Sequence, residues 1–259
     1  MSPPRLRRAD AAALLAGLAG LTLWLSLTDA FYRYLRPTMR PWLVAAGVFV
    51  AGLALATAVT AWRESRRDGA VSARPSVAGW LLVAPLVIAL STDPGALGAF
   101  AVRQQAGGYV PVGDFDLDAH LRSHTWGGQV PSLQLHQFLA AAKGDDDERR
   151  LLAATTVRLT GFVVHDRGAD GAPDPDGGFT LARLMIGCCA GDASGLVVAV
   201  RGHDGRRPDE DAWVEVTGSF DQALTAAQPQ DAIAGGVPVL AVSSLRDVDE
   251  PLQPYEYPG

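Results

Sequence analysis

Charged residues and cysteines are both scarce in this sequence. Only 19% of the 259 residues are charged, against about a quarter in a typical soluble domain. The two cysteines, Cys188 and Cys189, are neighbours. A disulfide between neighbours closes a strained ring and constrains no loop. The cysteines therefore indicate no redox compartment, and the low charge argues against an ordinary cytosolic enzyme.

Several common functional motifs are also missing. No segment has the spacing of a phosphate-binding glycine loop, a Ser–His–Asp set or a pair of catalytic carboxylates. Residues 104–259 contain 11 basic and 23 acidic residues, and Lys143 is their sole lysine. Because nucleic-acid binding depends on basic surfaces, this excess of negative charge predicts no nucleic-acid partner.

The charge that is present divides the chain into two parts. Residues 1–103 contain 11 arginines and five acidic residues, a net charge of +6, whereas residues 104–259 carry −12. All five histidines and both cysteines lie in the second part. We therefore expect any site chemistry in residues 104–259.

The first part contains three runs without a charged residue, at 11–28, 41–62 and 75–92. Each run is close to the length of about 20 residues that crosses a hydrocarbon core of about 30 Å. Trp42 and Trp62 lie at the two ends of the second run, where an aromatic belt is expected.

We predict that residues 1–103 form a multi-pass helical region in the cell membrane, surrounded by the lipid bilayer. The predicted spans cover about residues 11–28, 41–62 and 77–92. No small-x-small cleavage site follows Leu27, so the first span is predicted to be retained rather than cleaved as a signal peptide. Pro85 interrupts the third span, for which an interfacial or re-entrant helix is the alternative.

The arginines of the short loops predict the orientation. Three precede the first span and four lie at 63–76, against three at 29–40 and one after the third span. The positive-inside rule then places the N-terminus in the cytoplasm. With three spans, residues 104–259 are expected to be extracytoplasmic.

The second part begins with a stretch rich in glycine and polar residues. Residues 104–131 are predicted to be an extended linker, and 132–259 an acidic β domain. A short helix is expected at 132–142. The acidic run 145–148 lacks the alternating oxygen ligands of a calcium loop and is expected to be a solvated loop.

Short alternating apolar segments follow. The expected strands cover about residues 157–163, 179–186, 196–200, 213–220 and 237–242. Gly161 and Gly218 interrupt two of them at similar places, as at a bulge or a sharp barrel corner. Five such strands favour a small, OB-like barrel, with a β-sandwich as the alternative.

Three segments of this domain resemble a known family. Residues 188–193 read Cys-Cys-Ala-Gly-Asp-Ala, similar to the Cys-Cys-x-Ala-Asp-Ala signature of the YcgQ-like family of bacterial permease subunits. Residues 211–218 resemble its tryptophan-to-glycine strand, and residues 251–257 its closing proline and tyrosine motif. Gly191 stands where the family usually has alanine.

The resemblance covers nearly the whole chain. It implies a subunit role beside a separate, multi-span permease, but no particular cargo.

Cys188 and Cys189 have three possible roles. Thiolates are suited to zinc or copper(I), and Asp192, His165 and His203 are the candidate further ligands. The alternatives are a redox-active pair, including a vicinal disulfide, and a structural pair packed as small apolar side chains. Neighbouring side chains of a regular strand point to opposite faces, so one ion can bind both cysteines only at a strand end or a bulge.

Asp192 and the remaining histidines have simpler explanations as well. An aspartate after a strand commonly accepts hydrogen bonds from the backbone of a turn. His120, His124 and His136 lie on the expected linker or its helix, where exposed histidines are common.

Two functions from different classes follow from these observations. The first is a non-enzymatic accessory subunit of a permease complex, whose β domain binds a metal cation or the permease. The second is a membrane-tethered thiol oxidoreductase that uses Cys188 and Cys189.

The orientation leads to a test by cysteine labelling. A cysteine placed at position 170 in a Cys188→Ser/Cys189→Ser background should react with a membrane-impermeant maleimide in intact cells. Reaction only after permeabilisation would put the β domain in the cytoplasm.

Overall fold

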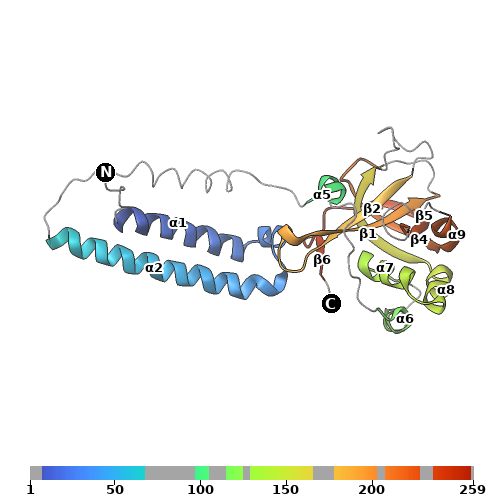
Figure 1. Ribbon diagram of the computed structural model, residues 1–259, viewed down its shortest axis with the longest axis horizontal. Coiled ribbons are helices and arrows are strands. Elements are labelled where there is room, and N and C mark those ends of the chain that lie inside the picture. Colours follow the sequence, from blue (N-terminus) through green and yellow to red (C-terminus); the bar gives the residue numbers. More distant parts are fainter. Residues whose placement is uncertain are drawn as a thin grey trace. The chain divides into compact units, whose positions relative to one another are not determined.

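The computed structural model describes residues 8–67, 97–104, 115–124, 129–165, 178–202, 208–227 and 236–257. The chain divides into two compact units, Met1–Gly95 and Ala96–Gly259, which we treat separately (Figure 1). The expected third span at 77–92 and the candidate ligand His203 lie outside the described residues.

The first unit contains two long helices that lie side by side (Figure 1). Helix α1 covers Arg8–Leu27 and helix α2 covers Arg40–Arg67. Of the 18 most apolar consecutive residues of each helix, only 17% in α1 and 11% in α2 are buried. A core helix of a soluble protein would be mostly buried, so these exposed apolar surfaces are typical of helices that meet lipid. Both helices are long and apolar enough to cross a membrane.

The connection between α1 and α2 is compact. Two short 3₁₀ helices, Asp29–Arg33 and Pro37–Met39, make the turn, and Phe31 is completely buried within it. The guanidinium of Arg40 donates a hydrogen bond of 2.7 Å to the carbonyl of Ser26 and lies over the Phe31 ring. These contacts hold the end of α1 against the start of α2.

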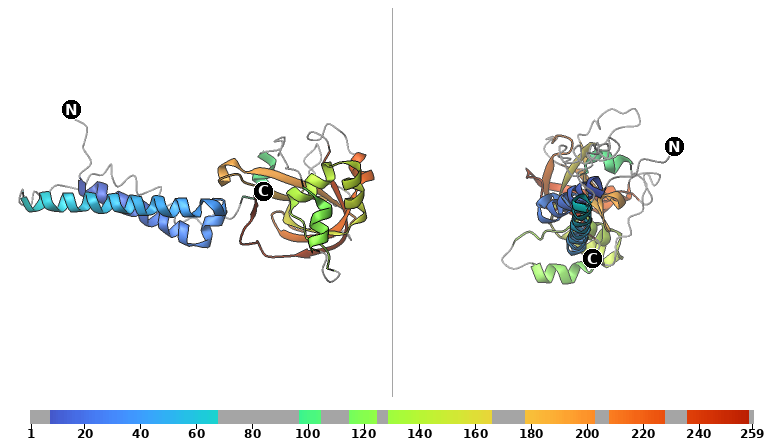
Figure 2. Two further views of the ribbon diagram at one scale, coloured as in Figure 1. Left: turned by 90° about the horizontal axis from the view of Figure 1, so that it is seen from below. Right: turned by 90° about the vertical axis from the view of Figure 1, so that its left-hand side faces the viewer.

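The second unit is built on a closed five-stranded barrel (Figure 2). The strands are β1 (Val157–His165), β2 (Phe179–Met185), β3 (Ser194–Arg201), β4 (Trp213–Asp221) and β5 (Val239–Asp247). They follow the order β1-β2-β3-β5-β4 and return to β1. Only the β3–β5 pair of this barrel is parallel. The expected OB-like small barrel is confirmed, and its closure rules out the sandwich alternative.

The barrel interior follows from the alternation of apolar residues along each strand. In β4, Val214, Val216 and Phe220 are buried and belong to the main core. Helices α7 (Leu135–Lys143) and α8 (Asp146–Ala154) lie next to each other against the barrel (Figures 1 and 2). Phe138 of α7 and Leu152 of α8, both completely buried, complete the core.

Gly218 lies at an irregularity in the pairing of β4 with β5, as its place in the sequence predicted. The register between β4 and β5 shifts between Thr217 and Gly218. A Cβ atom on Gly218 would lie 2.2 Å from the carbonyl oxygen of Ala241, a distance no side chain tolerates. Only glycine therefore allows the two strands to approach here.

Two helices occupy segments that were expected to be irregular. The acidic run 145–148 starts helix α8: the carboxylate of Asp145 accepts hydrogen bonds from the amides of Asp147 and Glu148, at 3.0 and 2.9 Å. Three acidic residues in the first turn also match the positive end of the helix dipole. The expectation of a solvated loop was wrong, because the acidic residues cap a helix.

The stretch expected to be an extended linker, 104–131, contains helix α6 (Leu117–His124). Asp116 caps it by accepting a hydrogen bond of 2.9 Å from the amide of Ala119. Leu117 is completely buried in the main core, and Leu121 packs against that core one turn later. Part of this stretch therefore belongs to the domain.

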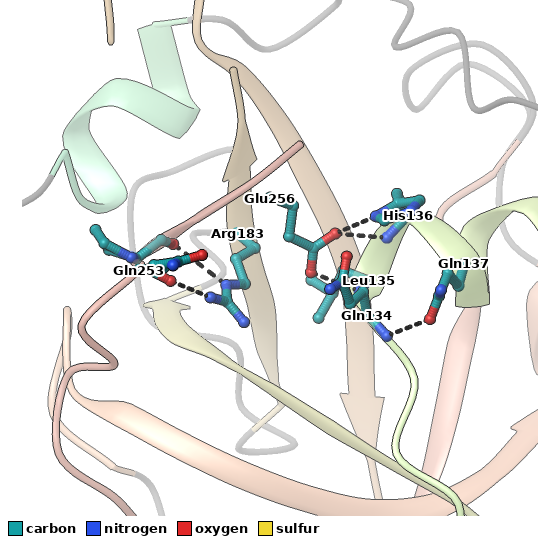
Figure 3. Close-up of polar contacts among 8 residues, drawn as sticks. Gln134, Leu135, His136, Gln137, Arg183, Gln253 and Glu256 are labelled. Atoms are coloured by element: carbon teal, nitrogen blue, oxygen red, sulfur yellow. Dashed lines mark hydrogen bonds and ion pairs between the residues drawn. The ribbon is translucent and has the colours of Figure 1, made fainter. Parts of the chain in front are cut away.

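The C-terminal tail is fastened to the end of β2. Strand β6 (Tyr255–Glu256) runs parallel to β2, pairing Tyr255 with Leu184 and Glu256 with Met185. The guanidinium of Arg183 donates to the carbonyl oxygens of Gln253 and Pro254 at 2.7 and 3.2 Å (Figure 3). The tail thereby becomes the sixth strand of the sheet.

Glu256 is the centre of this attachment. Its carboxylate accepts hydrogen bonds from the amides of Leu135 and His136, at 2.7 and 2.9 Å, and pairs with Nδ1 of His136 at 2.8 Å (Figure 3). Its backbone carbonyl accepts a bond of 3.0 Å from the amide of Ile186. Glu256 is 2% exposed, and the N-terminus of α7 supplies donors and a favourable dipole for the buried charge.

We predict that Glu256→Gln destabilises the second unit. The new amide group places a donor against the amides of α7, and leaving one of these groups unpaired costs about 1–3 kcal/mol. Denaturant unfolding of the full chain in detergent should show this loss. Glu250→Gln is the matched control, because Glu250 is exposed. Equal stability of the two variants would contradict the role of Glu256.

Candidate metal centre

The candidate ligands lie on the short connection between β2 and β3. Residues 186–193 form this turn, with a 3₁₀ helix at Ala190–Asp192. Ile186 at its start and Ala193 at its end are both buried in a second apolar cluster, together with Ala99 and Val102 of helix α5 (Ala99–Gln104). Buried residues therefore anchor both ends of the turn.

The carboxylate of Asp192 closes the turn. Its Oδ1 accepts a hydrogen bond of 3.0 Å from the amide of Gly187, and its Oδ2 accepts one of 2.8 Å from the amide of Cys188. A Cβ atom on Gly187 would lie only 3.2 Å from Oδ2. The absence of a side chain at Gly187 thus leaves room for the carboxylate.

This turn brings Cys188, Cys189 and Asp192 together. The two Sγ atoms and one carboxylate oxygen all lie within 4.8 Å of one another. Cys189 still has extended backbone angles, but the chain enters the 3₁₀ helix directly after it. The cysteines therefore lie beyond the regular part of β2, where neighbouring side chains can approach the same ion.

The three residues are open to solvent to different degrees. Cys188 and Asp192 are exposed, and Cys189 is half-buried. An ion can therefore reach the donors from solution. Two thiolates and one carboxylate are donor types that zinc binds in proteins.

Cys188 is a poor nucleophile in this setting. Hydrogen bonds from its thiol to Asp192, and to Cys189, raise the pKa of Cys188 to about 11. Reactive redox cysteines have a lowered pKa beside positive charge. Cys188 is therefore protonated at neutral pH unless a metal ion displaces the proton.

The pKa of the Asp192 carboxyl is shifted in the opposite direction. Partial desolvation alone raises this pKa, but hydrogen bonds from the Cys188 thiol and from the turn amides outweigh it and lower the pKa overall. The carboxylate is therefore ionised at neutral pH and available to a cation.

The basic residue closest to the cysteines in sequence has other partners. Arg183 donates to two tail carbonyls and lies 5.3 Å from the centre of the Trp213 ring. Burial lowers the pKa of Arg183, against an opposing effect of Glu256. Cys188 and Cys189 are both free thiols. Arg183 is therefore engaged with the tail rather than with the cysteines. Because a reactive redox cysteine needs positive charge beside it, this favours the metal hypothesis over the redox one.

His165 lies away from this group. It pairs in register with Phe179 at the start of β2, whereas the cysteines follow the end of that strand. Seven residues of strand at about 3.4 Å each separate the two ends by roughly 20 Å. His165 Nε2 instead lies 2.8 Å from the carbonyl oxygen of Pro208.

Sequence reasoning missed two positioning residues, Glu256 and His136. Glu256 holds the amide of Ile186, the first residue of the turn, and it also pairs with His136. Residues 251–257 resemble the closing motif of the YcgQ-like family, but this resemblance did not predict the contacts of Glu256. A pairing across about 120 residues has no local sequence signal.

We predict that Asp192 controls the reactivity of Cys188. In Cys189→Ser, which retains Cys188 and Asp192, alkylation by iodoacetamide should increase about tenfold per pH unit from pH 7 to 9, because the thiolate is scarce. Adding Asp192→Asn should lower the pKa and accelerate alkylation at pH 8. A pKa of Cys188 at the ordinary 9.0 in both variants would contradict this assignment.

The C-terminal part of the chain matches a known protein family. Residues 146–258 match the family described as DUF1980 C-terminal domain. No curated protein and no solved structure matches the chain. The matched residues include the barrel strands, the turn with Cys188, Cys189 and Asp192, and the tail with Glu256. Residues 146–258 are therefore similar to the DUF1980 C-terminal domain, and this match is consistent with the YcgQ-like family.

Proposed function

We propose that the chain is a non-enzymatic accessory subunit of a membrane permease complex, and that its barrel binds a zinc ion through Cys188, Cys189 and Asp192. The observation that carries this proposal is the group of three donor atoms within 4.8 Å of one another on an exposed turn. The partner is a separate multi-span permease, which the resemblance to the YcgQ-like family implies.

Zinc is favoured over copper(I) by the donor set. Copper(I) prefers soft sulfur ligands, whereas zinc also accepts carboxylate oxygen. Asp192 is ionised and lies within reach of both sulfur atoms. Two thiolates and a carboxylate carry three negative charges, which a divalent ion offsets better than a monovalent one.

The rest of the chain supports such a role. The net charge of −12 over residues 104–259 attracts cations. The exposed apolar helices α1 and α2 supply a membrane attachment. With three spans, the arginine distribution favours an extracytoplasmic barrel, and we propose that the ion binds on that side of the membrane.

The thiol oxidoreductase is the weaker hypothesis. It requires an accessible thiolate near neutral pH, but Asp192 raises the pKa of Cys188 to about 11. A metal ion is the natural competitor for that proton, because thiols deprotonate when they bind zinc.

We predict about one zinc ion per chain, as is usual for a site of this donor set. Full-length protein in detergent should retain this zinc through desalting, measured by elemental analysis. Cys188→Ser/Cys189→Ser should lose it, and Asp192→Asn should weaken it. His165→Ala is the matched control and should retain zinc fully.

Two results would contradict the proposal. One is equal zinc in the double serine variant and the unmodified chain. The other is unfolding of the double serine variant, because the cysteines would then have a structural role. The thermal unfolding of all variants should therefore be measured alongside the zinc content.

A further inference from the structure

We infer that zinc bound at Cys188, Cys189 and Asp192 keeps one coordination position open for a donor side chain of a partner protein. The inference rests on the proposed function and adds to it that a second protein can bind the ion directly. The number of ligands, the geometry of Asp192 and the way in which the turn is held all lead to it.

The first observation is the number of ligands. Zinc in proteins is usually tetrahedral: structural sites use four protein donors, whereas catalytic sites use three and keep the fourth position for water or substrate. Within the described ranges, only Cys188, Cys189 and Asp192 come together as metal-binding side chains. His165 lies at the other end of β2 and contacts Pro208. Three donors leave a fourth position for an external ligand.

The second observation is that Asp192 does not fill two positions. Oδ1 accepts the amide of Gly187 and Oδ2 accepts the amide of Cys188. Binding both oxygens to zinc would compete with both hydrogen bonds that close the turn. Asp192 therefore contributes one oxygen, and its second oxygen remains a backbone acceptor.

The third observation is that protein groups already hold the turn. Ile186 and Ala193 are buried, the amide of Ile186 donates to the Glu256 carbonyl, and Asp192 binds the amides at the start of the turn. A structural zinc site usually supplies the folding free energy of its loop. Since this turn has its own supports, losing the ion leaves the site intact.

The exposure of the site fits an exchange with a partner. Cys188 and Asp192 are both exposed, so a second protein can approach the ion. A histidine of that protein would displace a water molecule bound at the fourth position, and a cysteine would do so as its thiolate, with the thiol proton released to solvent. In this step a zinc–oxygen bond breaks and a zinc–nitrogen or zinc–sulfur bond forms, without oxidation or reduction of any group.

Cobalt(II) replaces zinc in the test, because its visible bands report the ligands of the ion. The full chain in detergent is loaded with Co²⁺ and titrated with imidazole as the external ligand. We expect thiolate-to-cobalt bands before the titration, and a saturable shift of the d–d bands as imidazole enters the fourth position. Bands that do not change with imidazole would show a closed site and overturn the inference.

Two variants complete the test. His203→Ala should give the same bands and the same imidazole response as the unmodified chain; altered bands in this variant would mean that His203 fills the fourth position, which overturns the inference. Cys188→Ser/Cys189→Ser should give no thiolate-to-cobalt bands. Absence of these bands in the unmodified chain would overturn the proposed function itself, an outcome distinct from a closed site.

Discussion

The buried carboxylate of Glu256 holds the second unit together around the candidate site. The carboxylate joins the tail to the N-terminus of α7, and the backbone of the same residue pairs the tail with the end of β2. A charge buried at this depth is tolerated only when donors surround it, since removing its partners costs several kcal/mol. Two amides and the ring of His136 supply these donors. The backbone carbonyl of Glu256 accepts a hydrogen bond from the amide of Ile186, which holds the start of the turn that carries Cys188, Cys189 and Asp192.

A second carboxylate shapes the turn itself. Asp192 binds the amides of Gly187 and Cys188, and in doing so bends the chain directly after β2. Two neighbouring cysteines can then approach one ion, which a continuous strand would prevent. The hydrogen bond from the Cys188 thiol to this carboxylate also raises the pKa of Cys188, to about 11, so the thiol is a poor nucleophile at neutral pH. The turn role and the metal role of Asp192 are therefore compatible.

The strands of the barrel could be predicted from local sequence patterns. The contacts by which Glu256 joins the tail to α7 and to the end of β2 could not. The alternation of apolar residues identified all five barrel strands, and Gly218 marked the bulge between β4 and β5. Acidic and polar composition concealed α6 and α8, because a capping aspartate has the same sequence signature as a solvated loop. The grouping of Cys188, Cys189 and Asp192 was predictable from their spacing. The distance of His165 from the two cysteines was not predictable, because it depends on the register of β1 against β2.

The most direct test of the central claim is X-ray absorption at the zinc edge of the zinc-loaded full chain. The account predicts two sulfur scatterers at about 2.3 Å and oxygen or nitrogen scatterers at about 2.0–2.2 Å in the first shell. A first shell of oxygen and nitrogen alone would contradict it, because the ion would then be bound away from Cys188 and Cys189.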